Sequence, residues 1–200
     1  MKTKIVRTVC AALVASATVF SGFGVAHASS IGGLTRTPPV RPGLHLVARR
    51  ATLPPFGFAG FCENQSDQCE KSGPVTMVEL SRDKRLELQA VNVQVNREIN
   101  YKDDSSKTDE WRAGVSEGDC DDYALTKRQR LLRAGWPSSA LRIATARTAS
   151  GVGHAVLVVS TSEGDLVLDN RTNVVKPWYA TQLRWIKIQS QEDPRIWLAL

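Results

Sequence analysis

The sequence predicts an α+β domain whose helices come in its first half and whose antiparallel sheet comes in its second half. Helical patterns cover residues 75–99 and 119–132, and a polar loop separates them. From residue 141 onward the pattern changes to short apolar or alternating runs divided by turn residues. Runs of helices followed by runs of strands are typical of the α+β class.

The N-terminal 28 residues have the features of a secretory signal peptide. A basic start precedes an apolar run over residues 9–20, and Ala26-His27-Ala28 provides a small-residue cleavage site. The competing interpretation, a membrane anchor, is disfavoured because a spanning helix needs about 20 apolar residues. We expect cleavage after Ala28, export to the periplasm or beyond, and no membrane span in the mature protein.

Removal of this leader changes the charge of the protein. The leader carries three basic and no acidic residues, so the formal net charge falls from +6 to +3. The remaining basic residues are scattered along the chain instead of forming one stripe. The composition therefore argues against a nucleic-acid-binding protein.

Residues 29–55 are predicted to be a flexible or loosely docked segment. They are rich in glycine, arginine and proline and show little periodicity. Residues 56–200 then form one domain, because about 145 residues suffice for a single sizeable core. We expect this domain to be a monomer.

The helical pattern over residues 75–99 is predicted to be one long helix or two short ones. Pro74 suits the first turn of a helix, where its missing N–H has no intrahelical partner. Charged residues separate the apolar positions, which are Met77, Leu80, Leu86, Leu88, Val91, Val95 and Ile99.

The second helix has clear start and stop signals. Asp119 is a good N-cap residue, and the pattern continues through Leu132. Gly135, followed by Trp136-Pro137, ends it. This places Cys120 at the helix N-terminus, where a thiolate is favoured.

The strands are expected at residues 141–145, 155–159, 166–168, 185–188 and 196–198. If residues 161–164 form a hairpin loop, Ser160 pairs with Asp165 and Val156 pairs with Asp169. His154 then shares a sheet face with Asp169 as a diagonal neighbour, roughly 7–8 Å away, within reach of extended side chains.

Cysteine parity singles out one thiol. Four cysteines become three when Cys10 leaves with the signal peptide. Cys62 and Cys69 are seven positions apart in a polar loop, which suits a local disulfide in an oxidising compartment. Cys120 is left over and is a candidate reactive group. A zinc site of Cys62, Cys69 and His154 is the alternative, although this spacing is unusual for zinc.

Cys120, His154 and Asp169 have the chemistry of a catalytic triad. The sulfur would attack as a thiolate, the imidazole would accept and return its proton, and the carboxylate would orient the imidazole. His154 is the one histidine inside the predicted domain, since His27 lies in the leader and His45 in the flexible segment. The alternative for His154 is a structural histidine at a strand start.

The aspartates beside Cys120 create an electrostatic conflict. Asp119, Asp121 and Asp122 raise the pKa of the thiol and oppose the helix N-terminus. A bound cation would neutralise them, and oxygen ligands at this density suit calcium better than zinc. The alternative is that they are an N-cap and solvated residues of the first turn.

Together these segments resemble the bacterial transglutaminase-like cysteine peptidases. The resemblance runs from about Phe56 to Trp197. Its pieces are Phe61-Cys62, Val91-Asn92, Val95-Asn96, Ile99, Tyr101, Asp109, Trp111, the segment from Gly118 to Ala124, Lys127, Gly153-His154-Ala155-Val156-Leu157 and Leu168-Asp169-Asn170.

The resemblance implies a papain-like, transglutaminase-type core with a Cys120-His154-Asp169 triad, and export to the periplasm. Well-understood relatives are calcium-dependent proteases that cleave large surface adhesins. Their acidic calcium ligands carry over to Asp119, Asp121 and Asp122. Asp121 departs from the pattern, because relatives often have glutamate there and a shorter carboxylate shifts the geometry.

The leading functional hypothesis is therefore an exported cysteine peptidase that processes a protein substrate in the cell envelope. Amide transfer is an alternative, because an amine can resolve the same thioester in place of water. A non-catalytic binding module stabilised by calcium is a third hypothesis, which the presence of all three triad residues disfavours.

Overall fold

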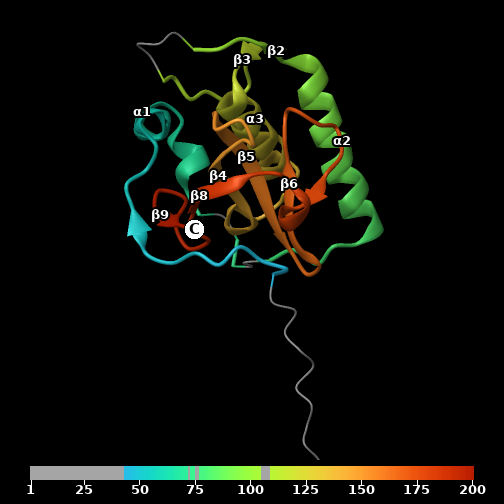
Figure 1. Ribbon diagram of the computed structural model, residues 1–200. Coiled ribbons are helices and arrows are strands. Elements are labelled where there is room, and N and C mark those ends of the chain that lie inside the picture. Colours follow the sequence, from blue (N-terminus) through green and yellow to red (C-terminus); the bar gives the residue numbers. More distant parts are fainter. Residues whose placement is uncertain (1–42, 72, 75–76, 105–108) are drawn as a thin grey trace, which may run out of the picture. The chain divides into compact units, whose positions relative to one another are not determined.

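A seven-stranded antiparallel sheet with helices on one face forms the described domain (Figure 1). The computed structural model describes residues 43–200 except 72, 75–76 and 105–108. The predicted signal peptide and residues 29–42 of the predicted flexible segment lie outside the described residues. The α+β class is confirmed.

The strands follow the spatial order β1-β9-β8-β4-β5-β6-β7 in the large sheet. A small parallel pair, β2 with β3, lies apart from it. The helices are α1 (Phe56–Asn64), α2 (Arg82–Glu98) and α3 (Cys120–Arg133), and the strands are β1 (Ala51–Thr52), β2 (Asn100–Tyr101), β3 (Glu117–Gly118), β4 (Leu141–Arg147), β5 (Gly153–Thr161), β6 (Gly164–Leu168), β7 (Lys176–Pro177), β8 (Arg184–Gln189) and β9 (Trp197–Ala199).

Residues 155–159 of strand β5 are all apolar because both faces of the sheet are covered. Leu157 and Val159 belong to the larger core cluster, which α2 and α3 share with the sheet. Val156 and Val158 point the other way into a smaller cluster. Helix α3 packs on β4 and β5, and α2 packs on α3 (Figure 1). The expectation of a helix packed on an antiparallel sheet is thus confirmed.

The β5–β6 hairpin has the predicted register. Ser160 pairs with Asp165 and Thr161 with Gly164, while Leu157 pairs with Leu168 at the other end. Gly164 has a φ of +116°, and a Cβ there would lie 2.6 Å from the carbonyl oxygen of Leu44. A glycine is therefore required at this turn. The register brings the chain after Leu168 beside the start of β5.

Helix α2 begins later than predicted. Its first residue is Arg82, because the Ser81 hydroxyl caps the helix by accepting the Lys84 N–H at 3.2 Å. The chain before the cap is extended, since the Val78 N–H donates to the Ser160 carbonyl at 3.0 Å. The predicted helix start at Pro74 is therefore wrong. The prediction began too early because Met77 and Leu80, which precede Ser81, lie at helical spacing with the apolar residues of α2.

Residues 43–55 are the described part of the segment that was predicted to be flexible, and they lie along the sheet. The Leu46 N–H donates to Asp165 Oδ2 at 2.8 Å, and β1 pairs with β9. This part of the segment is held by backbone hydrogen bonds, although its composition gives no sign of them. Among the helices of the described residues, none has the length and apolar character needed to cross a membrane.

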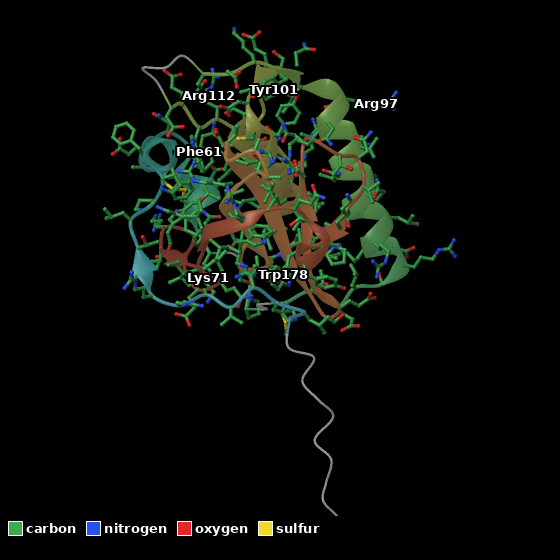
Figure 2. All side chains as sticks on the ribbon, in the orientation of Figure 1. Phe61, Lys71, Arg97, Tyr101, Arg112 and Trp178 are labelled. Carbon is green, nitrogen blue, oxygen red and sulfur yellow. A yellow bond between two sulfur atoms is a disulfide. The ribbon has the colours of Figure 1, made fainter. Side chains whose placement is uncertain are left out.

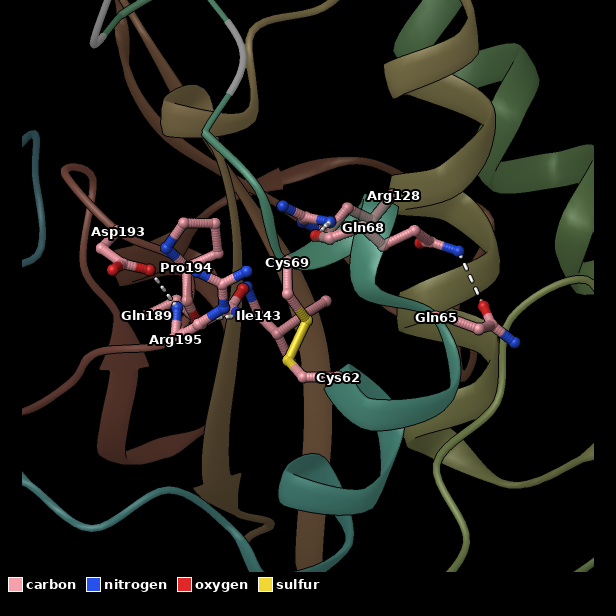
Figure 3. The surroundings of a disulfide bond; sticks show 10 residues. All are labelled: Cys62, Gln65, Gln68, Cys69, Arg128, Ile143, Gln189, Asp193, Pro194 and Arg195. Carbon is pink, nitrogen blue, oxygen red and sulfur yellow. Dashed lines mark hydrogen bonds between the residues drawn. A yellow bond between two sulfur atoms is a disulfide. The ribbon is translucent and has the colours of Figure 1, made fainter.

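Cys62 and Cys69 are joined in a disulfide, as the spacing predicted (Figure 3). The bond ties the end of α1 to the short 3₁₀ helix Ser66–Cys69. Arg128 of α3 donates to the backbone carbonyls of Gln68 and Leu141, so this corner is also held to the main helix. Because both sulfurs are bonded to each other, the alternative zinc site with His154 is wrong.

Replacing both Cys62 and Cys69 with serine is expected to lower the free energy of unfolding by about 2–3 kcal/mol, because the short loop gains freedom in the unfolded chain. Urea denaturation of the two proteins measures the difference. Thiol titration of the denatured, unreduced mature protein should find one reactive thiol. Three thiols, or an unchanged urea midpoint, would contradict the prediction.

Candidate active site

The N-terminus of α3 carries the free thiol. Asp119 is the N-cap, and its Oδ1 accepts the Asp121 N–H at 3.3 Å. Cys120 is the first helical residue and is not disulfide-bonded. Gly118 is needed just before the cap, because a Cβ there would lie 2.0 Å from Asp122 Oδ2. The predicted N-cap and helix start are both confirmed.

The start of β5 meets this helix terminus. The backbone N–H of Ala155 donates to Cys120 Sγ at 3.3 Å. His154, the preceding residue, is buried, and its Nε2 lies 2.9 Å from Oδ1 of Asp169, immediately after β6. The hydrogen bond that the hairpin register predicted is therefore present. Because this bond uses Nε2, the other ring nitrogen, Nδ1, can exchange a proton with a second group.

A pocket of about 450 Å³ gives access to these groups. Cys120 and His154 both line it, and Tyr101 of β2 forms part of its wall. Figure 2 shows Tyr101 and Arg112 at the same end of the domain. A second pocket of about 370 Å³ is lined in part by Asp169 and shares Arg171 with the first. The thiol and the imidazole thus both border a pocket that is open to the surface.

Arg171 is a site residue that the sequence analysis missed. Its Nη2 donates to Asp169 Oδ2 at 2.8 Å, and its backbone N–H donates to Oδ1 at 2.9 Å. Burial raises the pKa of Asp169 because it disfavours the charged carboxylate. The hydrogen bonds from His154 and Arg171 outweigh this effect and hold the pKa of Asp169 well below its usual range. The signal in the sequence was a cation two residues after the aspartate, at the distance of an Asx turn.

Asparagine side chains of α2 form hydrogen bonds with the loop that carries Asp169. The Asn96 amide donates to the carbonyl of Asp169 at 3.1 Å, and the Asn92 amide donates to that of Thr172 at 3.0 Å. Four residues separate the two asparagines, so they lie on one helix face. Polar residues at that spacing on the buried face were the sequence signal for this contact.

Asp119, Cys120 and Asp121 form the candidate metal site of the described residues, because one potential ligand atom of each lies within 4.8 Å of the others. Asp121 is only 5% exposed, and its Oδ1 has no hydrogen-bond partner. Burial, then the neighbouring Asp119 and Asp122, raise the pKa of Asp121 far above its usual range. An unpartnered buried carboxylate oxygen beside a second carboxylate fits a hard cation such as calcium.

Asp122 is turned away from this cluster. Its Oδ1 accepts the backbone N–H of Arg112 at 2.7 Å, and the Arg112 guanidinium lies 3.6 Å from Oδ2. Burial raises the pKa of Asp122 to about 6, although Arg112 works in the opposite direction. Of the three predicted ligands, Asp119 and Asp121 lie together in this cluster and Asp122 lies outside it, and their role as ligands stays a prediction. Consecutive helix positions point about 100° apart, so Asp121 and Asp122 face different neighbours.

The surroundings of Cys120 disfavour the ionised form of its thiol. Burial, and then the negative charge of Asp121 when it is ionised, raise the pKa of Cys120 to about 12. The N–H of Ala155 works in the other direction but does not compensate. The helix N-terminus alone therefore does not produce a thiolate here. A proton acceptor beside the sulfur, and a cation that neutralises Asp121, would each favour the ionised thiol.

The chain is similar to one protein family and to several solved structures. Residues 48–200 match the family model described as bacterial transglutaminase-like cysteine proteinase. Calcium-bound Legionella pneumophila LapG is similar in structure, with a TM-score of 0.52 and 27% identity over 60% of this chain and 71% of that chain. Another LapG structure has a TM-score of 0.50 and 30% identity over 57% of this chain and 68% of that one. EGTA-treated LapG has the same score and identity, and covers 57% and 66%. No curated protein shows significant similarity.

Proposed function

Since this chain belongs to the bacterial transglutaminase-like cysteine proteinases, we propose that it hydrolyses peptide bonds through an acyl-enzyme at Cys120. The observation that carries the proposal is the buried hydrogen bond between Asp169 and His154, which lines the same pocket as the free thiol. A nucleophile, a base and a group that orients the base are the parts that acyl transfer needs.

In the proposed reaction, His154 Nδ1 accepts the proton of Cys120 while the sulfur attacks the scissile carbonyl. The imidazolium then protonates the leaving amine, and a thioester remains on the sulfur. Water attacks the thioester while His154 takes a proton from it, the carbon–sulfur bond breaks and releases the acid, and the imidazolium returns its proton to the sulfur. Asp169 keeps its charge throughout, which stabilises the imidazolium and fixes the ring, while Arg171 fixes Asp169. The backbone N–H of Cys120 is the proposed oxyanion donor.

We further propose that Asp119 and Asp121 hold a calcium ion. The similar LapG structures include one described as calcium-bound, and Asp121 has an unpartnered, buried carboxylate oxygen in this chain. A bound calcium ion supplies positive charge that keeps both carboxylates ionised without repulsion. Asp119 is also the N-cap of α3, so the same two residues determine where the helix begins and where the thiol lies.

The proposed location is the cell envelope or the exterior, and the proposed substrate is a protein of that compartment. Two features support this: the signal-peptide pattern of residues 1–28 and the disulfide between Cys62 and Cys69. Disulfides persist in exported proteins and are rare in the cytosol.

Comparison of protein N-termini in envelope fractions tests the function. Cells with the wild-type protein should contain new N-termini that are missing from cells with Cys120→Ala, and a calcium chelator should remove the same set. The matched control is the Cys62→Ser/Cys69→Ser protein, which loses two cysteines but keeps the thiol. Identical N-termini in wild-type and Cys120→Ala cells would overturn the proposal. Incorporation of a labelled amine into glutamine without peptide cleavage would favour amide transfer instead.

A further inference from the structure

Gly153, the first residue of β5, is an exposed glycine that the fold itself does not require. Its φ lies outside the left-handed region, and a Cβ added to it would have no heavy atom within 4 Å. Among the described glycines, only Gly60 and Gly153 have neither a positive φ nor an obstructed Cβ position. Glycine weakens a strand because it has no side chain to pack, and it often marks a place where a ligand or another backbone approaches closely.

One edge of β5 has no partner strand where Gly153 lies. Strand β4 pairs with β5 from Gly153 to Val159, whereas β6 pairs with it only from Leu157 to Thr161. In the described part of the chain, no strand pairs with residues 153–156 on the β6 side. An unpaired strand edge presents N–H and C=O groups to which another extended chain can bind.

The backbone groups of Gly153 lie on this free edge. Successive residues of an antiparallel strand direct their N–H and C=O groups alternately to the two neighbouring strands. The Val152 carbonyl faces the β4 side, because it accepts the Thr148 N–H at 2.9 Å. The Ala155 N–H faces the opposite side, because it donates to Cys120 Sγ at 3.3 Å. Gly153, two residues before Ala155, therefore directs its N–H and carbonyl to the same side as the sulfur.

This edge borders the candidate active site. Gly153 lines the pocket that Cys120 and His154 also line. Val152, another residue of the pocket wall, is 62% exposed and adds apolar surface next to the edge. An extended chain that lies along the edge thus passes beside the thiol.

We propose that the free edge of β5 at Gly153 binds the main chain of the protein substrate as an added strand. The inference rests on the proposed function for the identity of this chain. The Gly153 N–H donates to a substrate carbonyl and the Gly153 carbonyl accepts a substrate N–H, as in other cases of strand addition to a sheet edge. The missing side chain leaves room for the approach. Such pairing recognises extended polypeptide, and neighbouring side chains such as Val152 then contact the substrate side chains.

Gly153→Val tests this inference in the mature protein. A valine side chain fits the open space and favours a strand, so the urea midpoint should not fall. The side chain blocks the approach to two backbone groups, so KM for a peptide that the wild type cleaves should rise by about tenfold or more. Iodoacetamide does not pair with the edge and should label Cys120 at the wild-type rate.

Gly60→Val is the matched control. Gly60 of α1 is also exposed and also has open space at its Cβ position, but it lines a different pocket. This variant should keep the wild-type KM. An unchanged KM in folded Gly153→Val would overturn the inference. Equal slowing of peptide cleavage and iodoacetamide labelling would also overturn it, because the valine would then disturb the thiol itself. If Gly153→Val does not fold, Gly153→Ala replaces it with the same readouts and outcomes.

Binding to an array of immobilised peptides separates this inference from the proposed function. Cys120→Ala protein should bind peptides of the array, its Gly153→Val derivative should lose this binding, and its Gly60→Val derivative should keep it. Binding that depends on Gly153 in a protein whose wild type cleaves no peptide would support the inference and overturn the proposed function. Peptide cleavage that is insensitive to Gly153→Val would do the reverse.

Methylation of single backbone nitrogens in a bound peptide tests the main-chain pairing directly. At least one N-methylated copy should lose binding to Cys120→Ala protein, because methylation removes the N–H that the Gly153 carbonyl accepts. Equal binding of all N-methylated copies would contradict pairing through the main chain and overturn the inference.

Discussion

Replacing Cys120 with alanine is expected to lower kcat/KM for peptide hydrolysis by at least about 10⁴-fold. No other group in the pocket replaces the sulfur, because the acyl intermediate forms on it. The substitution removes one half-buried atom that accepts a single N–H from Ala155, so the fold should be retained. Cleavage of a peptide library by the two purified proteins, read by mass spectrometry, measures the effect.

Cys120→Ser is the informative control for this loss. It keeps the shape of the nucleophile but replaces sulfur with an oxygen that is much harder to ionise, so activity should also fall below detection. Iodoacetamide should label wild-type protein at Cys120, and labelling should be slower in His154→Gln because the sulfur loses its proton acceptor. Substantial hydrolysis by Cys120→Ala would show that the reaction does not pass through the thiol.

The elements that could be predicted from sequence are those fixed by local signals. Asp119 and Gly135 bracket α3 because a cap and a positive φ are properties of single residues. The β5–β6 register followed from its turn and its alternation. From that register the hydrogen bond between His154 and Asp169 followed as a geometric consequence, which is why two of the three proposed catalytic groups could be paired in advance.

Contacts between distant segments could not be predicted in the same way. Met77 and Leu80 lie at helical spacing before Ser81, but this stretch is extended because Val78 between them forms backbone hydrogen bonds with the end of β5. Similarly, nothing local distinguishes Asp121 from Asp122 as a metal ligand. Their difference arises because Arg112, ten residues earlier, is brought against Asp122 by the loop before β3. These features depend on tertiary packing, which overrides local propensity.

Replacing Asp121 with asparagine is expected to weaken the dependence of folding stability on pH and on calcium. Without calcium, the raised pKa of Asp121 means that the folded state keeps a proton that the unfolded chain has lost. The folded state then binds more protons, so stability falls as pH rises from the ordinary carboxylate pKa of about 4 into the neutral range. The amide does not titrate, so Asp121→Asn should lack this slope and, in EGTA at pH 7, melt at least about 4 °C above the wild type.

Calcium should reverse this order. A bound ion stabilises the folded wild type by about 2.7 kcal/mol at a concentration of 100 times its Kd, whereas the asparagine variant has lost a charged ligand and should gain little. Asp122→Asn is the matched control, because that carboxylate faces Arg112 and its replacement should leave the calcium response intact. Thermal unfolding of the three proteins in EGTA and in calcium gives all the comparisons. An equal calcium shift in Asp121→Asn and the wild type would show that the ion, if it binds, does so without Asp121, and the unpartnered oxygen would then need another explanation.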